Sequence, residues 1–137
     1  MPADVRLLDD EQRALVQMVR EFADEVAAPA AAGYEERSED PAPLYKQLAE
    51  LDLTGIPFPE RYGGGEQPYS TYLLVVEEIA RAYLGFAIGL SVHTLCSFAV
   101  NEFGSEDLKE RVLTKLCAGE WFGAYSLSEP GSGSDAV

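Results

Sequence analysis

The sequence predicts an all-α fold, a bundle of five to six helices, with one strand at the C-terminal end. Three observations carry this prediction. Apolar residues recur three and four positions apart in successive segments, which is the spacing of one helix face. Residues typical of helix caps and helix ends separate these segments. The stretch 86–100 contains no Asp, Glu, Lys or Arg, as expected for a helix at the centre of a bundle.

The first helix is predicted to begin at Asp9. Asp9 is a favourable N-cap, and Gln12 three residues later completes a capping box. Pro29 is expected to end or kink the helix near residue 28, because proline has no amide hydrogen to donate inside a helix. The polar stretch 30–39 is then expected to be a connection. The apolar face of this helix consists of Leu15, Val19, Phe22 and Val26.

The second helix is predicted to begin at Asp40-Pro41, with Asp40 as cap and Pro41 in the first helical position. It is expected to end before Gly55. Two prolines and three glycines within 56–65 predict an irregular loop. The run 62–65 lacks the lysine of a phosphate-binding loop, so we interpret it as a flexible or tightly turned connection. The apolar stripe of the second helix consists of Leu44, Leu48 and Leu51.

The third helix is predicted to open at Pro68 or Ser70 and to run to about Tyr83. Glu77 and Arg81 stand at the i, i+4 spacing that favours an ion pair on a helix surface. The face expected to pack into the core consists of Leu73, Val76, Ile79, Ala80 and Tyr83.

Gly85 separates this helix from a fourth, predicted over about 86–103. Because the fourth helix is apolar all round, we expect it to be buried on every side. Its small residues would let a neighbouring backbone or a ligand approach closely. Gly104 is expected to end it, and Ser105 to cap a fifth helix that ends at Gly119. The apolar stripe of the fifth helix consists of Leu108, Val112 and Leu116.

The pattern changes after the fifth helix. Residues 121–127 form an apolar, aromatic run typical of a strand, and a turn rich in Gly, Ser and Pro follows. A single strand leaves its backbone donors and acceptors without partners, so we expect a second domain to follow. We therefore divide the chain into a helical domain, 1–119, and the opening strand and turn of a second domain, 120–137.

Composition argues against several classes of function. The net charge is −14, from 24 acidic and 10 basic side chains, which disfavours nucleic acid and anionic membranes as partners. No uninterrupted apolar run approaches about 20 residues, so no transmembrane helix is expected. Residues 1–6 lack the apolar core of a signal peptide. Cys96 and Cys117 have no metal-site or disulfide spacing, and we interpret them as buried free thiols of a cytosolic protein.

Two features have both a structural and a functional interpretation. His93, the only histidine, is either a hydrogen-bonded core residue or a residue that contacts a ligand. The run 131–134, Gly-Ser-Gly-Ser, is either a surface turn or an anion-binding nest of backbone amides. Glu129 is interpreted as a turn residue beside a proline. No catalytic triad and no metal-ligand cluster is predicted.

Three stretches resemble one known family. Residues 123–135, Gly-Ala-Tyr-Ser-Leu-Ser-Glu-Pro-Gly-Ser-Gly-Ser-Asp, closely resemble the flavin-binding signature of the acyl-CoA dehydrogenases. Residues 59–64, Pro-Glu-Arg-Tyr-Gly-Gly, resemble the family's loop between early helices, and Gly119-Glu120 resembles the lead-in to the signature. The resemblance covers essentially the whole chain. It implies an N-terminal helical domain plus the start of a middle β-domain.

The resemblance also implies a cofactor, FAD, and sites for it. In the family, residues at these positions contact the flavin through main-chain groups and a hydroxyl, and they approach its diphosphate and the acyl-CoA. Ser128 stands where threonine is common. The flavin-binding residues implied are Tyr125, Ser126, Leu127, Ser128, Gly133 and Ser134. The substrate-binding residues implied are Ser134 together with Gly89, His93 and Ser97 of the central helix.

The reaction implied is α,β-dehydrogenation of an acyl-CoA thioester, in which a glutamate removes a proton and a hydride passes to flavin N5. In most members that glutamate belongs to the C-terminal domain, so we assign no catalytic residue within 1–137. The chain alone is expected to be inactive and to hold FAD weakly. The cysteines and the N-terminus predict a cytoplasmic protein, and the family implies fatty acid or amino acid catabolism.

The family further implies an electron-transferring flavoprotein as electron acceptor and a homodimer or homotetramer for the full-length enzyme. The alternative is a helical interaction module that stands by itself and has no catalytic activity.

Overall fold

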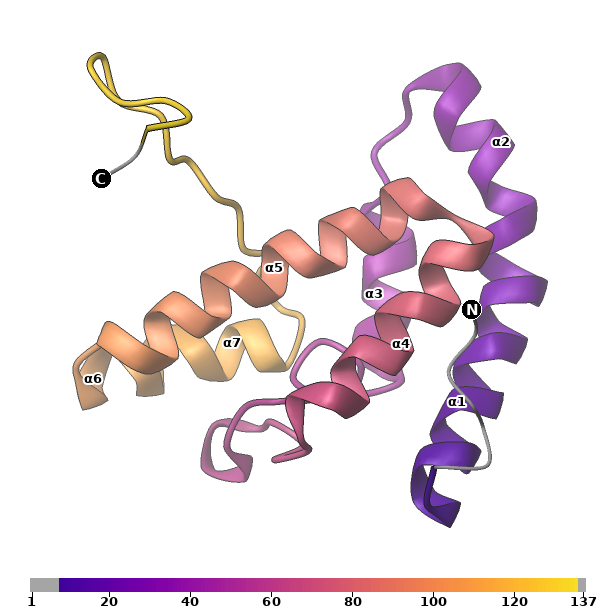
Figure 1. Ribbon diagram of the computed structural model, residues 1–137, viewed down its shortest axis with the longest axis horizontal. Helices are drawn as coiled ribbons and strands as arrows, with labels where there is room; N and C mark the ends of the chain where they lie inside the picture. Colours follow the sequence, from indigo (N-terminus) through magenta and orange to yellow (C-terminus); the bar gives the residue numbers. More distant parts are fainter. Residues whose placement is uncertain (1–7, 136–137) are drawn as a thin grey trace.

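The computed structural model describes residues 8–135 and confirms the all-α fold (Figure 1). The helices join into five continuous rods, α1–η2–α2, α3, α4, α5 and α6–η4–α7. Here η2 and η4 are π-helical turns, and a 3₁₀ turn, η3, lies in the loop after α3. The bounds are α1 Asp10–Phe22, η2 Ala23–Ala27, α2 Ala28–Arg37, α3 Ala42–Glu50, η3 Glu60–Tyr62, α4 Tyr69–Ala82, α5 Leu84–Phe103, α6 Glu106–Leu108, η4 Lys109–Leu113 and α7 Thr114–Cys117.

The predicted capping box at the start of α1 is confirmed. The Gln12 amide N–H donates to Asp9 Oδ1 at 2.7 Å, and the Asp9 N–H donates to Gln12 Oε1 at 3.4 Å. The Gln12 side chain also donates to Thr71 Oγ1 at 3.2 Å, which ties the start of α1 to the start of α4.

The first rod is longer than predicted, because the helix does not end at Pro29. A π-helical turn, η2, comes just before the proline, so Pro29 falls in the first turn of α2, where no amide hydrogen is needed. The rod continues to Arg37 and ends at Ser38, whose φ of 50° is left-handed. The stretch 30–39, expected to be a connection, is therefore mostly helix. In Figure 1 the rod runs down one side of the molecule.

The second and third helices lie close to their predicted positions. Asp40 Oδ1 accepts the Ala42 N–H at 3.0 Å at the start of α3. Helix α4 begins one residue after Pro68 and ends at Ala82. The break before α5 is at Tyr83 rather than Gly85, since Tyr83 has an extended backbone with φ −148° and ψ 94°.

The main core lies among α1, α3, α4 and α5, with α4 packed against both α1 and α5. Its buried apolar side chains include Val19, Phe22, Leu48, Val75, Ile79, Phe86 and Leu90. A smaller cluster joins the loop after α3 to the fifth rod and consists of Phe58, Tyr62, Leu113 and Cys117.

The predicted core face of α4 is partly wrong. Leu73 is half exposed, whereas Glu78 is 7% exposed and lies within the buried face. The face turned inward consists of Thr71, Tyr72, Val75, Glu78 and Ile79. Glu78 was left out of the predicted face because a charged residue is usually exposed. Here it is buried, and it pairs with Arg20 of α1 and Arg81 of α4.

Glu78 is held by two arginines. Arg20 forms a two-pronged contact with its carboxylate, Nε to Oε2 at 2.9 Å and Nη2 to Oε1 at 2.5 Å. Arg81 adds a third hydrogen bond at 3.3 Å and donates to Asp24 at 2.6 Å. The hydrogen bond from Arg20 lowers the pKa of the Glu78 carboxyl, against the opposing effect of burial. Arg81 therefore pairs with Glu78 and Asp24 instead of the predicted Glu77.

The glycine-rich loop after α3 is tightly turned. Three backbone bonds fold it onto itself: Gly65 N–H to Gly55 O at 3.1 Å, Glu66 N–H to Phe58 O at 2.9 Å and Gln67 N–H to Ile56 O at 3.0 Å. Gly64 lies so close to this backbone that a Cβ on it would stand 2.1 Å from Phe58 O. Only glycine fits there, and the loop can then seal the core with Ile56 and Phe58.

Helix α5 is not buried on every side as predicted. Its inner face holds Phe86, Leu90, His93 and Ser97, while Leu84, Ile88, Leu95 and Phe98 on the outer side are each close to half exposed or more. Among residues 8–135, α5 is also the one helix long and apolar enough to cross a membrane by length and composition. The sequence had not predicted such a helix, because small polar residues interrupt the apolar run. Core helices of other proteins meet the same criterion.

The fifth rod begins as predicted, with Ser105 Oγ accepting the Leu108 N–H at 3.3 Å. A π-helical turn then shifts the buried stripe, so Leu113 is buried where Val112 was expected. Gly119 ends the rod with a left-handed φ of 63°.

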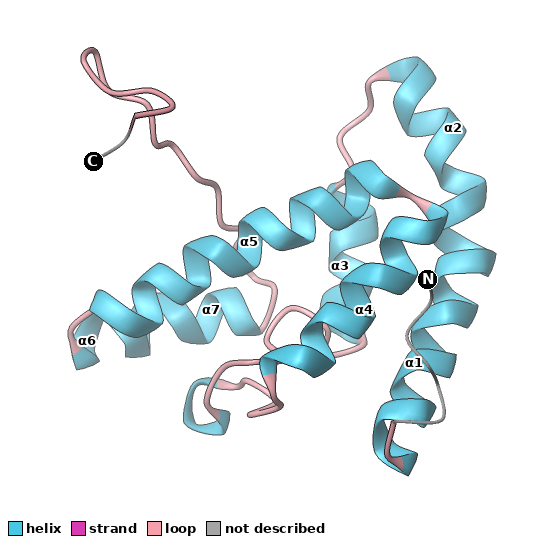
Figure 2. Cartoon of the chain, in the orientation of Figure 1, coloured by secondary structure: helices cyan, strands magenta, loops and turns pink. Residues whose placement is uncertain are grey.

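The strand expected at 121–127 is not formed. Figure 2 shows no strand in the described part of the chain; residues after α7 run as an extended loop that leaves the helices beside α5. No other strand lies alongside to complete a ladder, which is why the extended conformation stays unpaired. The bridge between Glu129 and Ser132 closes a turn near the end of the chain.

The Arg20–Glu78 contact supplies a first prediction. Replacing Glu78 by Gln removes the charge between the two arginines, and we expect the free energy of unfolding to fall by roughly 1–3 kcal/mol. Urea denaturation followed by circular dichroism measures the change. The control is Glu77→Gln, one residue along and exposed. Equal effects of the two substitutions would contradict the assigned role of Glu78.

The loop supplies a second prediction. We expect Gly64→Ala to lower the free energy of unfolding by about 1–3 kcal/mol, because the added methyl group collides with backbone that cannot move independently. The matched control is Gly131→Ala, whose Cβ would meet no atom within 4 Å. Urea unfolding compares them, and a tolerated Gly64→Ala would show that the loop is looser than described.

Candidate functional site

The residues predicted to bind flavin lie together in the segment after α7. Tyr125, Ser126, Leu127 and Ser128 follow one another in an extended conformation, and all four are exposed. Among residues 8–135, the backbone groups of 124–128 form no hydrogen bond. The segment therefore presents main-chain donors and acceptors, and two serine hydroxyls, to whatever lies beside it.

A turn reverses the chain after Ser128. The Glu129 N–H donates to Ser132 O at 2.8 Å, and the Ser132 N–H donates to Glu129 O at 3.1 Å. Gly133 and Ser134 follow on the return side and are exposed. A Cβ on Gly133 would meet nothing within 4 Å, so the space beside it is open to a ligand. The surface-turn interpretation of 131–134 fits this geometry, and a cofactor contact is compatible with it.

His93 attaches this segment to α5. Its imidazole is fully buried, and Nδ1 accepts the Gly123 N–H at 3.1 Å. The ring also packs against Phe122, with centroids 4.6 Å apart and planes inclined by 39°. Since Nδ1 accepts, the ring is neutral and Nε2 carries the hydrogen. Burial lowers the pKa of His93, while the nearby backbone of Thr54 and Leu116 acts in the opposite direction.

Nε2 is less well satisfied than Nδ1. Within the described residues it has no partner in hydrogen-bonding geometry, although backbone groups of Thr54 and Leu116 lie near enough to affect the pKa. The side chain is thus a core histidine with one specific contact, made to the segment at 122–123.

Tyr45 also packs against Phe122. The two rings lie 4.4 Å apart, and Tyr45 packs against Phe86 of α5 at 4.7 Å. The Tyr45 hydroxyl donates to Phe86 O at 3.3 Å. Gly89 makes room for this hydroxyl, because a Cβ there would stand 1.6 Å from it. Phe122 therefore packs against both a tyrosine and a histidine.

The structure does not bring Gly89, His93 and Ser97 into either of the two pockets described below. They lie one turn apart on the face of α5 turned toward protein, and the Ser97 hydroxyl donates to His93 O at 2.9 Å. Their role in binding an acyl group stays a prediction. Gly89 and His93 instead have packing partners that explain their size and chemistry.

Sequence reasoning missed an apolar groove between α4 and α5. It has a volume of about 470 Å³, within the range of ligand pockets. One wall consists of α5 residues three or four positions apart, Ser91, Thr94, Leu95 and Phe98. This spacing can be recognised in the sequence if α5 is treated as having an inner and an outer face. The lining residues are Tyr69, Tyr72, Leu73, Val76, Ser91, Thr94, Leu95 and Phe98.

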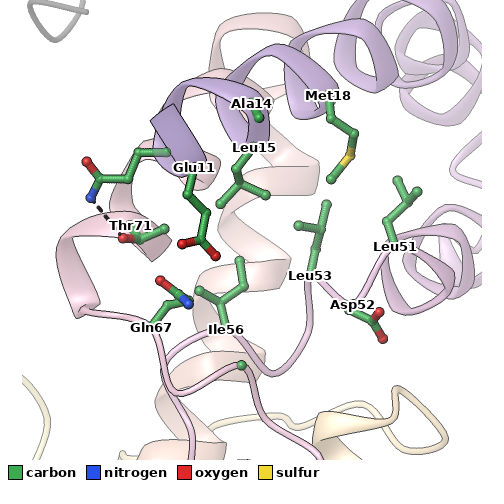
Figure 3. A pocket seen from close by; sticks show the side chains of 12 residues that line it. Glu11, Ala14, Leu15, Met18, Leu51, Asp52, Leu53, Ile56, Gln67 and Thr71 are labelled. Atoms are coloured by element: carbon green, nitrogen blue, oxygen red, sulfur yellow. Dashed lines mark hydrogen bonds between the residues drawn. The ribbon is translucent and has the colours of Figure 1, made fainter. Parts of the chain in front are cut away.

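A second pocket, of about 410 Å³, lies between α1 and the loops that flank the glycine-rich turn. Figure 3 shows Leu15, Met18, Leu53 and Ile56 around it, with Glu11 and Asp52 close by. Its floor is apolar and these two carboxylates make its rim acidic. An anionic ligand is disfavoured there.

The described residues contain no group of three or more His, Cys, Asp or Glu side chains that could hold a metal ion. Both cysteines are free, and burial raises the pKa of the Cys117 thiol to about 11, so this thiol is not a nucleophile near neutral pH.

Comparison with known proteins decides the family. Residues 9–120 match the family model described as acyl-CoA dehydrogenase, N-terminal domain. The chain belongs to the acyl-CoA dehydrogenase family. The expectation based on residues 123–135 is thereby confirmed by a match that lies wholly outside them.

Relatives of this acyl-CoA dehydrogenase chain include a short-chain specific acyl-CoA dehydrogenase of Clostridium acetobutylicum, 38% identical over 94% of the chain. Mitochondrial isovaleryl-CoA dehydrogenase of Pongo abelii is 39% identical over the whole chain. The chain spans about a third of the length of these relatives, 34% in each case. A crystal structure of an acyl-CoA dehydrogenase complexed with FAD from Bacillus anthracis superposes on 96% of the chain and 22% of its own length, with TM-score 0.88 and 34% identity.

The buried imidazole supplies a prediction on pH. Because the folded chain lowers the pKa of His93, the unfolded chain binds the proton more readily, and stability falls as pH drops below about 6.5. Urea unfolding between about pH 7.5 and pH 5.5 measures this for the native chain and for His93→Asn. The variant should lack the part of the slope due to the imidazole. Identical slopes in both would contradict the assignment.

Proposed function

We propose that this chain supplies the N-terminal helical part of an FAD-dependent acyl-CoA dehydrogenase. The observation that carries the proposal is the position of the signature segment: it is fixed to one face of α5, and the neighbouring face of the same helix lines an open apolar groove. One helix thus connects a candidate cofactor contact with a candidate acyl site.

The segment 125–128 fits a flavin. The edge of a flavin ring alternates carbonyl groups and ring nitrogens, and it takes main-chain donors and acceptors like those left unpaired here. The hydroxyls of Ser126 and Ser128 add to this set. Bound FAD would supply the redox chemistry, by accepting a hydride from the substrate. The residues of this chain would hold and orient the cofactor and exclude water from one side of it.

The groove between α4 and α5 fits the acyl chain of the substrate. Aromatic and aliphatic side chains dominate its lining, and the Ser91 hydroxyl is already bonded to Ala87 O at 3.0 Å. No charged residue lines it, so it suits a hydrocarbon chain and not the phosphates of CoA. The pocket beside α1 is formed by other elements and has an acidic rim, so we do not place the acyl group there.

The remaining parts of the function are proposed from the family alone. The catalytic base would come from outside residues 1–137, an electron-transferring flavoprotein would accept the electrons, and the whole enzyme would be a homodimer or homotetramer. A place in fatty acid or amino acid catabolism belongs to the same proposal, whereas a cytoplasmic location is proposed from the two free cysteines.

A second candidate, an interaction module without catalysis, is favoured by one observation: the outer face of α5 stays apolar and exposed. The same face is what an acyl group or an adjoining domain would cover. The two candidates differ in whether the purified product of the complete gene carries flavin.

We expect that product to show flavin absorbance and to reduce an artificial electron acceptor with acyl-CoA. A colourless product with no activity across a series of acyl-CoA chain lengths would favour the interaction module.

The groove is tested by Leu95→Lys, which places a charge on the acyl-binding surface at a half-exposed position. We expect KM for acyl-CoA to rise roughly tenfold, because apolar contact with the acyl chain is lost. Steady-state kinetics measure it. The control is Leu84→Lys, at a more exposed position of α5 outside the groove lining. Equal KM changes in both variants would place the acyl group elsewhere.

A further inference from the structure

His93 makes its one specific contact to the segment that carries the flavin signature. Its Nδ1 accepts the Gly123 N–H at 3.1 Å, and its ring face packs on Phe122. Phe122 also packs against the ring of Tyr45, with centroids 4.4 Å apart. No other side chain in the described residues hydrogen-bonds the backbone of 121–128, so the imidazole is the polar anchor of this stretch.

We propose that His93 is a positioning residue, which fixes the backbone of Phe122 and Gly123 on α5 and thereby sets where the flavin-binding segment Tyr125–Ser128 begins. The inference rests on the proposed function for the flavin contact. The anchoring itself depends only on the geometry of this chain.

The distance from anchor to site is short. Gly123 stands two residues before Tyr125, and two extended residues span only about 7 Å. A shift of the anchor is therefore passed on to the main-chain groups at 125–128. Neither Ala124 nor Tyr125 makes a backbone hydrogen bond within the described residues that would resist such a shift.

Gly123 is adapted to the same contact. A Cβ on it would stand 2.6 Å from Cys96 Cβ and 3.2 Å from His93 O. Only glycine lets the segment approach α5 closely enough for the N–H to reach Nδ1. The anchor thus has a component on each side, an acceptor on the helix and a residue without a side chain on the segment.

The first experiment uses the 137-residue chain without flavin. Hydrogen exchange at the Gly123 amide, followed by NMR, reports the anchor, and acrylamide quenching of Trp121, the only tryptophan, reports the neighbouring backbone. We expect His93→Leu, which removes the acceptor, to speed exchange at Gly123 by about tenfold. His93→Asn, whose Oδ1 lies near the position of Nδ1, should stay within about threefold of the native rate.

The control is Glu78→Gln, which removes the charged partner of Arg20 between α1 and α4 and has no contact with 122–123 among the hydrogen bonds described. It should lower stability without a local effect at Gly123. If His93→Leu does not fold, Gly123→Ala tests the same docking from the segment side and should increase the quenching of Trp121, which is 49% exposed in the native chain. Unchanged exchange in a folded His93→Leu, or unchanged quenching in Gly123→Ala, would overturn the anchor.

The second experiment measures FAD affinity of the complete gene product. We expect His93→Leu to weaken FAD binding by about tenfold and His93→Asn to restore it. Native protein that binds no FAD would refute the proposed function while leaving the first experiment to decide the anchor. Full FAD affinity in a variant with a released Gly123 amide would refute the positioning role alone.

Discussion

The uncharged stretch 86–100 of α5 constrains the arrangement of everything around it. A helix with apolar residues on all sides must be covered on several sides, and α4, the loop after α3, the fifth rod and the segment at 121–123 each cover part of it. The one polar ring on its inner face, His93, is used to dock the segment that follows the helices. The groove toward α4 is one part of its surface left open, and the exposed side chains of Leu84 and Ile88 mark another.

Local signals in the sequence predicted what local interactions determine. The capping box at Asp9 and the N-cap at Ser105 were predicted correctly, because each depends on residues within one turn. The same holds for the stop at Gly119. The fold class and the family followed from periodicity and from the signature at 123–135, and the family match over 9–120 confirms both.

Errors arose wherever a distant residue decides the outcome. Glu78 was left out of the predicted core face, but Arg20, which is far away in sequence, pairs with it in its buried position. Helix α5 was expected to be covered all round, yet how much of a helix is covered depends on the elements that pack on it. A strand at 121–127 needs a neighbouring strand, and none is present in the described residues. The contact between His93 and Gly123 joins the middle of α5 to the segment after α7. No rule of residue spacing connects these two parts of the sequence.

The two π-helical turns have a consequence for how the length of this chain can vary. Each holds one residue more than a regular helix would use, so each is in effect an insertion that the helix absorbs without breaking. Successive residues of a helix are rotated by about 100°, and removing one residue from 23–27 would turn all of α2 by that angle. Tyr34, which packs against the core, would then point elsewhere. The extra residues thus act as phase shifts, which let one rod present two differently oriented faces to the same core.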